Sequence, residues 1–405
     1  MKILLSAYAC APGQGSDPEI GWNWMRQLAR SHEVWVVTRA TKRLSVEKGL
    51  IDEPVLNAHF VYVDLPKPLR FWKNWPGAIY VYYYLWQILA YARVRKLHRK
   101  IGFELAQHVT FGMYWMPSFL CLLPVPFIWG PVGGGESTPS RFRSGFRLRG
   151  RIYELIRRLA QAGSALDPFV RLTARRAKLA LATTNETAVK LTALGCRRVQ
   201  VTSCLALSSE DLCLIDSTQR RPGKAFRIVS AGRLLHWKGF HFAIEAVARI
   251  AECVPSIEYW IFGTGPERKA LEQLARERGI LDRVKFQAGI PRNELLQKLA
   301  EFDVMVHPSL HDSGGFVCLE AMSAGCAVVC LDLGGPAVQV TAETGIKIPA
   351  VSPDQAIRDL AEALERLASD TGLRQRLSQA ARERVREAFI WEAKVKSLGE
   401  IYSRS

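Results

Sequence analysis

The segment from residue 304 to residue 324 constrains the fold more than any other part of the chain. Residues 304–307, three apolar residues followed by a histidine, are typical of the end of a buried strand, and the pattern from about residue 317 to residue 324 predicts a helix. Gly314 and Gly315 lie in the loop between them. A strand, a glycine-bearing loop and a helix in this order predict a parallel α/β sheet with a ligand site beside the loop.

Two acids flank this loop, Asp312 before the glycines and Glu320 within the predicted helix. The unpaired backbone N–H groups at the start of a helix suit a diphosphate, and carboxylates on either side could accept hydrogen bonds from sugar hydroxyls. The residues expected to contact the diphosphate are Gly314, Gly315, Phe316 and Val317. The alternative is a surface acid at 312 and a first-turn helix acid at 320 that the helix dipole stabilises.

A second segment, residues 228–247, supplies positive charge. Its predicted strand runs into Gly232 and Arg233, Lys238 follows five residues after the arginine, and a helix comes next. Arginine offers a planar fork and lysine a compact charge, which are the two cationic ways to hold phosphate oxygens. Because both follow a strand, we expect them at the edge where open α/β sheets bind ligands.

With these residues the chain resembles the retaining glycosyltransferases of family 4, which have the GT-B architecture. The phosphate-binding Arg and Lys of that family match Arg233 and Lys238, and its acid–seven residues–acid element matches Asp312 to Glu320. The resemblance implies an α/β fold of two doubly wound, Rossmann-like domains that face a central cleft. It also implies that Glu320 binds the nucleotide ribose and that the acid at 312 binds the donor sugar.

Two segments between these motifs are also similar to the family. Residues 260–267 look like its strand and glycine turn, and residues 283–290 look like the strand beside the nucleotide base. The resemblance therefore implies nucleotide contacts at Gly263 and Ile290.

The chain departs from the family at Asp312, where a glutamate is usual. The shorter side chain leaves three arrangements open: direct contact with the sugar, contact through a water molecule, or transfer of the role to His311 or Ser313.

The N-terminal half begins with a predicted strand at residues 2–8, a loop at 10–17 that holds Gly13 and Gly15, and a helix at about 18–30. Such a loop can bind an anion, although the third glycine of the dinucleotide fingerprint is missing. An ordinary turn is the alternative. The resemblance implies that Gly15 and Ser16 face the cleft and touch the donor phosphate and the acceptor.

Glu136 and His108 are further candidates. Glu136 follows three glycines and could orient an acceptor hydroxyl or pair with Arg141. The apolar neighbours of His108 are typical of a core histidine, whereas the resemblance implies a place near the donor sugar. On that resemblance, His108, Asp312 and Glu320 are the predicted catalytic residues.

The positive charge is concentrated in the first half of the chain. Residues 1–205 carry 29 Lys and Arg against 12 Asp and Glu, a net charge of +17, whereas residues 206–405 carry 26 of each sign. Residues 148–159 place Leu and Ile at helical spacing among arginines, which predicts a basic amphipathic helix on an anionic membrane surface. The alternatives are a solvated basic face on a core helix and nucleic-acid binding. We expect no nucleic-acid partner, because no recognition fold accompanies the charge.

Two apolar stretches, residues 79–92 and 109–135, are expected to lie in the core or to form a partly embedded surface. The first is shorter than the ~20 residues that a membrane span needs, and prolines and glycines interrupt the second. The opening apolar run has only the length of a strand, so no signal peptide is expected.

The nine cysteines are scattered, without a Cys-x-x-Cys pair or histidines at zinc spacing. The sequence also lacks the Asp-x-Asp pair that bridges a metal to a diphosphate. These patterns predict a reduced, cytosolic chain with no cofactor, no bound metal and a metal-independent reaction.

A polar passage with Ser, Pro and Gly at about 205–225 predicts the domain boundary. We therefore expect an N-terminal acceptor-binding domain at residues 1–205 and a C-terminal donor-binding domain at 206–384. A closing helix at 385–405 is expected to cross back to the first domain.

The predicted function is a retaining glycosyltransferase that moves a sugar from a nucleotide-sugar donor to a saccharide or lipid-linked saccharide acceptor in surface polysaccharide synthesis. The protein is expected to be cytoplasmic and peripheral on the inner face of the plasma membrane. The alternatives are a nucleotide-sugar epimerase of the same architecture and a non-catalytic membrane-surface protein.

Overall fold

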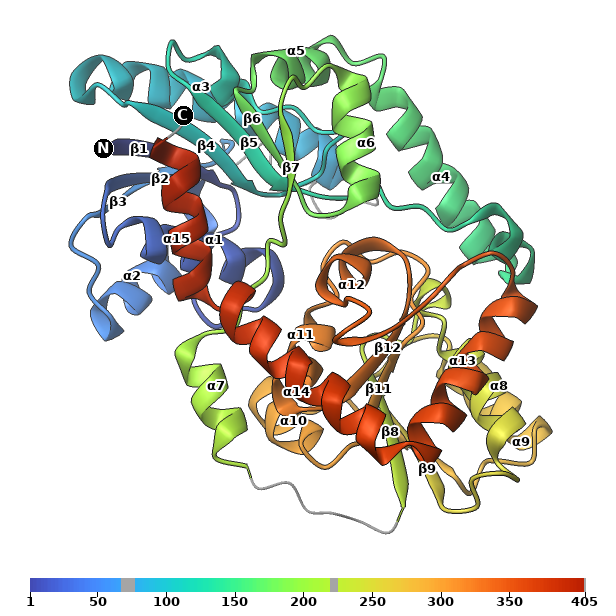
Figure 1. Ribbon diagram of the computed structural model, residues 1–405. Coiled ribbons are helices and arrows are strands. Elements are labelled where there is room, and N and C mark those ends of the chain that lie inside the picture. The colour runs from blue at the N-terminus through green and yellow to red at the C-terminus, as the bar shows by residue number, and fades with distance from the viewer. Residues whose placement is uncertain (67–76, 219–224, 404–405) are drawn as a thin grey trace. The chain divides into compact units, whose positions relative to one another are not determined.

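The computed structural model describes residues 1–66, 77–218 and 225–403, which form two compact units (Figure 1). The first unit consists of Met1–Gly135, Arg157–Cys204 and Val395–Ser405. The second unit consists of Glu136–Ile156 and Leu205–Lys394.

These units differ from the expected domains in two segments. Residues 136–156, expected in the first domain, pack with the second unit, because Phe142 and Phe146 are buried in its core. The closing segment joins the first unit from Val395, ten residues later than expected. Part of the expected linker, residues 219–224, lies outside the described residues.

The described part of the first unit contains a seven-stranded parallel sheet with the order β3-β2-β1-β4-β5-β6-β7. In its centre Leu4 lies between Trp35 and Ala106 of the two neighbouring strands. The central strands read as continuous apolar runs because helices cover both faces of the sheet. The strand bounds are β1 Lys2–Ala7, β2 Glu33–Arg39, β3 Ala58–Val63, β4 Leu105–Thr110, β5 Phe127–Val132, β6 Leu179–Ala182 and β7 Val199–Val201.

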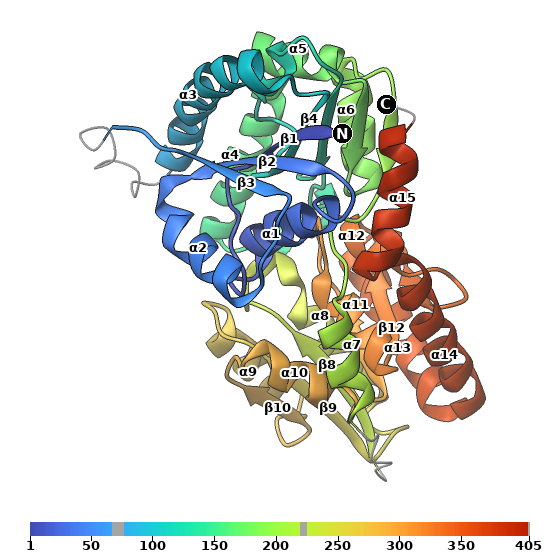
Figure 2. The same ribbon diagram turned by 90° about the vertical axis from the view of Figure 1, so that its left-hand side faces the viewer.

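Helices α1 and α2 lie on one face of this sheet, and α3 and α5 lie on the other (Figures 1 and 2). In the stretch at residues 79–92, Tyr82, Tyr83 and Trp86 of α3 are fully buried in the core, whereas Tyr80, Val81 and Ile88 are exposed. No helix among the described residues is both long enough and apolar enough to cross a bilayer. The helices are α1 Ser16–Leu28, α2 Arg43–Asp52, α3 Ala78–Ile101, α5 Pro168–Arg176, α6 Asn185–Leu194 and α15 Trp391–Ser403, with 3-10 turns η1 Ala40–Lys42 and η4 Phe119–Leu122.

The described part of the second unit contains a six-stranded parallel sheet with the order β10-β9-β8-β11-β12-β13. The chain winds outward from β8 to β10 on one side and from β11 to β13 on the other. The order therefore reverses between β8 and β11, and ligands of doubly wound sheets bind at this reversal. The strand bounds are β8 Phe226–Ala231, β9 Ile257–Phe262, β10 Val284–Gln287, β11 Val304–His307, β12 Ala327–Leu331 and β13 Gly345–Ile348.

Two groups of helices pack in this unit. Helices α8, α9 and α13 form one group, and α7, α10, α11 and α14 form the other (Figure 1). Helix α4, Leu148–Ser164, begins in the second unit and ends in the first. The remaining bounds are α7 Ser209–Asp216, α8 Phe240–Ile250, α9 Arg268–Glu277, α10 Arg292–Leu299, α11 Phe316–Ala324, α12 Gly334–Gln339, α13 Pro353–Ser369 and α14 Thr371–Ala388, with 3-10 turns η5 Ser140–Gly145 and η6 His236–Lys238.

Candidate functional site

The loops after β8 and β11 bring together the residues that the two main motifs singled out. The strands pair directly, with Val304 beside Ile228, so their following loops leave the same edge of the sheet. Lys238 follows β8, and Asp312 and the start of α11 follow β11. The candidate site therefore lies at the reversal of strand order in the second unit.

Glycines allow these loops to approach each other closely. Gly239 has φ 70°, and a Cβ on it would overlap the carbonyl oxygen of Pro308. A Cβ on Gly263, whose φ is 150°, would overlap the carbonyl oxygen of Gly232. Gly263, which was expected to contact the nucleotide, thus also has a steric reason to be glycine.

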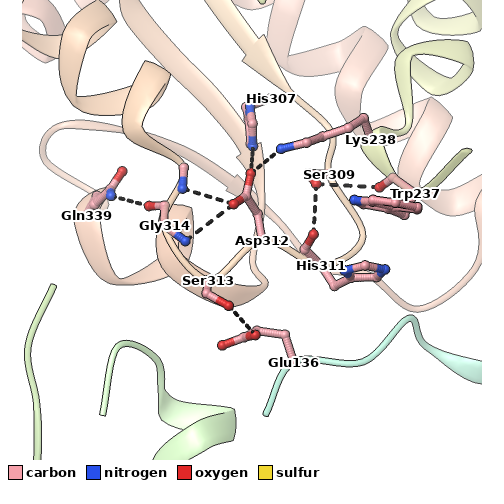
Figure 3. Close-up of polar contacts among 11 residues, drawn as sticks. Glu136, Trp237, Lys238, His307, Ser309, His311, Asp312, Ser313, Gly314 and Gln339 are labelled. Atoms are coloured by element: carbon pink, nitrogen blue, oxygen red, sulfur yellow. Dashed lines mark hydrogen bonds and ion pairs between the residues drawn. The ribbon is translucent and has the colours of Figure 1, made fainter. Parts of the chain in front are cut away.

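The Asp312 carboxylate is at the centre of the site (Figure 3). One oxygen, Oδ2, forms an ion pair with Lys238 Nζ and lies 3.2 Å from His307 Nε2. The other, Oδ1, accepts hydrogen bonds from the backbone N–H groups of Gly314 and Gly315 at 3.3 and 3.1 Å. Burial alone would raise the pKa of this carboxyl, but the charge of Lys238 and the bond to His307 outweigh burial and hold the pKa well below its usual range. Asp312 is therefore an anion at neutral pH.

Helix α11 begins at this carboxylate. Gly315, with φ 65°, is its N-cap, and the N–H groups of Phe316 and Val317 in the first turn have no acceptor within the helix. Two hydrogen bonds from α12 fix the loop before α11. The side-chain amide of Gln339 donates to the Gly314 carbonyl, and the backbone N–H of Gly335 donates to the Asp312 carbonyl. Backbone N–H groups beside a lysine can hold an anionic oxygen group such as a phosphate.

Glu320 lies on the buried side of α11 and binds Arg292. Its Oε1 accepts from Arg292 Nε at 2.6 Å, and the two terminal nitrogens of Arg292 donate to Asp211 at 2.5 and 3.0 Å. The guanidinium also lies over the Phe316 ring, 4.8 Å from its centre. Burial raises the pKa of Glu320, and the charge of Arg292 offsets part of this rise.

Sequence reasoning missed Arg292 and Asp211. One signal was present: Arg292 occupies the first position of α10, where the helix dipole disfavours a cation. A cation there implies a compensating carboxylate nearby, but nothing in the local sequence identifies that carboxylate as Glu320.

The structure assigns partners to the two residues next to Asp312. His311 Nε2 lies 2.9 Å from Glu154 Oε1, and the His311 ring stacks on Trp237. The hydroxyl of Ser313 donates to Glu136 Oε2 at 2.6 Å (Figure 3). Glu136, the acceptor candidate, therefore belongs to the second unit, together with the loop that carries Asp312.

Two other predicted residues of the second unit lie at the ends of strands. Arg233 follows β8 and is exposed, without an ion-pair partner among the described residues. Ile290 lies half-buried between β10 and α10, two residues before Arg292. The exposed guanidinium of Arg233 is thus open to an anion in solution.

The predicted residues of the first unit lie on β4 and at the start of α1. His108 of β4 is 1% exposed and lies beside Tyr83, and burial lowers its pKa to about 4. Its imidazole is therefore neutral at pH 7, as expected of a core histidine. Gly15, with φ 60°, is the N-cap of α1, and Ser16 begins this helix.

This pair of doubly wound parallel sheets is the GT-B fold. Sucrose-phosphate synthase from Thermosynechococcus elongatus superposes with a TM-score of 0.65 at 18% identity, covering 100% of this chain and 98% of that one. HepE of Anabaena, in a crystal structure with UDP, superposes with a TM-score of 0.64 at 17% identity over 100% of both chains. At these identities the similarity establishes the fold.

Residues 215–384 match the family model of glycosyl transferases group 1. The lipopolysaccharide core biosynthesis glycosyltransferase LpsD of Rhizobium meliloti (strain 1021) is 33% identical over 183 residues, which cover 45% of this chain and 51% of LpsD. The chain spans about half the length of the curated relatives it matches.

Proposed function

We propose that the protein transfers a sugar from a nucleotide-sugar donor to a saccharide or lipid-linked saccharide acceptor, with retention of configuration at the transferred carbon. One observation is the main support for the proposal. Lys238, Asp312 and the first turn of α11 lie together at the point where the strand order reverses. The HepE structure with UDP and the name of LpsD support the donor class and a role in surface glycan synthesis.

In this proposal the second unit binds the donor. Lys238, Arg233 and the N–H groups of Phe316 and Val317 neutralise the charge that develops on the departing nucleoside diphosphate. Glu320, with its position set by Arg292, accepts hydrogen bonds from the ribose hydroxyls. Asp312 is the group next to the donor sugar.

The backbone at Gly263 and Ile290 contacts the nucleoside, and the first unit presents the acceptor through the loop at Gly15 and Ser16. We assign no step in this proposal to His108, which is buried among core side chains of the first unit.

The same residues support a reaction without a metal ion. A lysine, an arginine and oriented N–H groups supply the positive charge that a metal would otherwise bring to the diphosphate. The acceptor then attacks from the face that the nucleotide leaves, which accounts for retention without a protein nucleophile. Chelation of divalent metals with EDTA is therefore expected to leave the transfer rate unchanged.

A lipid-linked acceptor places the reaction beside a bilayer. We propose a peripheral location on the cytoplasmic face, where the excess of 29 basic over 12 acidic residues in the first half of the chain would attract anionic lipid.

The first test is donor binding followed by transfer. A thermal-shift screen with UDP, GDP, ADP and dTDP sugars identifies the donor, and transfer is then measured for Lys238→Ala and Glu320→Ala. Each variant is expected to lower transfer at least about tenfold, because each removes an interaction with the donor. Lys190→Ala, on the exposed side of α6 in the first unit, is the matched control and should transfer at the wild-type rate.

Three outcomes contradict the proposal. Near wild-type transfer by both site variants removes the assigned roles. Conversion of the donor sugar without any acceptor indicates an epimerase. Failure to bind any nucleoside diphosphate in calorimetry indicates a non-catalytic protein. The relatives do not favour either of these last two functions, since their names describe glycosyl transfer.

A further inference from the structure

Helix α4 has its apolar side turned to the solvent. Leu148, Ile152, Leu155 and Leu159 follow each other at spacings of three and four residues and are 73, 48, 54 and 63% exposed. Ile156, beside them, is 62% exposed. Five large apolar side chains on one face of a helix form a patch of the kind that marks an interaction surface.

The polar side of the same helix faces the protein. Glu154 is 3% exposed and binds His311 Nε2 at 2.9 Å, and the Tyr153 ring stacks on Trp237 with 4.9 Å between ring centres. Gly150 lies against the imidazole of His236, so no larger side chain fits there without displacing that ring. These contacts determine the rotation of the helix about its axis. The outward position of the apolar side is therefore built into the fold.

The charged residues around the apolar side of α4 indicate what kind of partner it binds. Residues 141–158 contain seven arginines and one acid, Glu154, which is buried. Arg149 and Arg158 are exposed and flank the apolar side on opposite edges of the helix. A second copy of the chain would bring arginines against arginines. A nucleic acid would pair with the arginines but would leave the leucines in water.

We propose that α4 lies in the plane of an anionic lipid bilayer, with Leu148, Ile152, Leu155, Ile156 and Leu159 embedded at the level of the acyl chains. The arginines at the edges of the helix then reach the lipid phosphates, as long basic side chains do at membrane interfaces. The proposal rests on the proposed function only for its biological purpose, which is access to a lipid-linked acceptor.

The inner contacts of α4 connect this surface to the donor site. Trp237 and His311 precede Lys238 and Asp312 in the chain, and both contact residues 153–154 of the helix. A helix held on the membrane would therefore also hold the two loops that carry the ion pair of the site.

Binding to vesicles tests the proposal. The full chain is mixed with extruded vesicles of phosphatidylcholine, with or without phosphatidylglycerol, and the bound fraction is measured after sedimentation. We expect binding to the anionic vesicles and much weaker binding to the neutral ones. The double variant Leu155→Gln/Leu159→Gln should bind at least about tenfold more weakly, since two apolar contacts are lost. Arg149→Gln/Arg158→Gln should also weaken binding to anionic vesicles.

The matched control is Leu44→Gln/Leu56→Gln, which changes two leucines that are 83 and 91% exposed elsewhere on the first unit. It should bind vesicles as the wild type does. Wild-type binding by Leu155→Gln/Leu159→Gln, or no binding of the wild-type chain to anionic vesicles, overturns the proposal. A dimer in sedimentation analysis that the same variant dissociates also overturns it, because a second copy would then cover the helix.

Calorimetric titration with UDP in the absence of vesicles separates this inference from the proposed function. A chain that binds UDP but no vesicles contradicts the membrane surface alone. A chain that binds vesicles but no nucleoside diphosphate contradicts the proposed function and leaves the surface assignment intact.

Discussion

At the scale of single residues, backbone geometry limits the substitutions that the candidate site accepts. Gly239 and Gly279 have nearly the same left-handed conformation, with φ 70° and 69°, but different surroundings. A Cβ on Gly239 would overlap the Pro308 carbonyl oxygen, whereas nothing lies within 4 Å of a Cβ on Gly279.

This pair separates backbone strain from steric overlap. Gly279→Ala is expected to lower the free energy of unfolding by about 1–2 kcal/mol, the cost of a side chain in the left-handed region. Gly239→Ala should lower the free energy of unfolding by about 2 kcal/mol more than Gly279→Ala does, because the loop at Pro308 must move. Urea unfolding measures both, and equal losses would show that the loops after β8 and β11 are not packed as described.

The Asp312 side chain occupies the partners that the proposed function assigns to the diphosphate, and it would therefore compete with a bound diphosphate. Its carboxylate is ionised at neutral pH and already binds Lys238 and the N–H groups of Gly314 and Gly315. Asp312→Asn keeps an oxygen for those N–H groups but removes the negative charge.

We therefore expect Asp312→Asn to bind UDP more tightly, by roughly tenfold or about 1.4 kcal/mol. Transfer should nevertheless fall, because the group that we propose to lie next to the sugar has lost its charge. Calorimetry measures UDP binding, and Glu320→Gln, expected to bind UDP more weakly, is the contrasting variant. Weaker UDP binding by Asp312→Asn would mean that the carboxylate does not oppose the diphosphate.

At the scale of elements, Arg292 joins three helices of the second unit. It extends from α10 to Glu320 of α11 and Asp211 of α7, and its guanidinium covers the ring of Phe316. The side chain of Arg292 is 38% exposed, so water screens part of these interactions.

Arg292→Ala is expected to lower the free energy of unfolding by roughly 1–2 kcal/mol and to weaken UDP binding, because Glu320 loses its anchor. The control is Arg278→Ala, which removes a similar two-bond pair with Glu245 from a side chain that is 49% exposed. Arg278→Ala should lower the free energy of unfolding by about 0–1 kcal/mol, with no change in UDP binding. Equal effects of the two variants would contradict the anchoring role of Arg292.

At the scale of the whole molecule, the described chain passes four times between its two units, after residues 135, 156, 204 and 394. We expected passages near 205 and 385 from the sequence, and the structure has them after residues 204 and 394. The sequence did not predict that residues 136–156 belong to the second unit, because those residues resemble a basic surface helix. Only their contacts with the core of the second unit, through Phe142 and Phe146, reveal where they pack.

The two-unit organisation predicts where a nucleotide changes hydrogen exchange. UDP at about a hundred times its Kd stabilises the unit that binds it by about 2.7 kcal/mol. Exchange should therefore slow in residues 228–238 and 304–324, measured by mass spectrometry of peptides with and without UDP. The same experiment with inorganic phosphate is the control for a general ionic effect. Slowing confined to residues 1–135 would place the nucleotide in the first unit instead.

The sequence by itself determined the fold class and the loops on which the candidate site residues lie. Strand and helix periodicity, the glycine loops, and the spacings from Arg233 to Lys238 and from Asp312 to Glu320 are properties of neighbours along the chain. The order of strands and helices then indicates the edge of the sheet at which such residues gather. Local patterns therefore sufficed for these conclusions.

Only the tertiary structure decided which partners hold these residues and which side of α4 meets the solvent. Arg292 is 28 residues from Glu320, and Glu154 is 157 residues from His311. The apolar periodicity of α4 predicted an amphipathic helix, but the contacts of Glu154 and Tyr153 turned its polar side inward. A periodicity records that one face of a helix differs from the other, whereas the burial of either face depends on what the rest of the chain places against it.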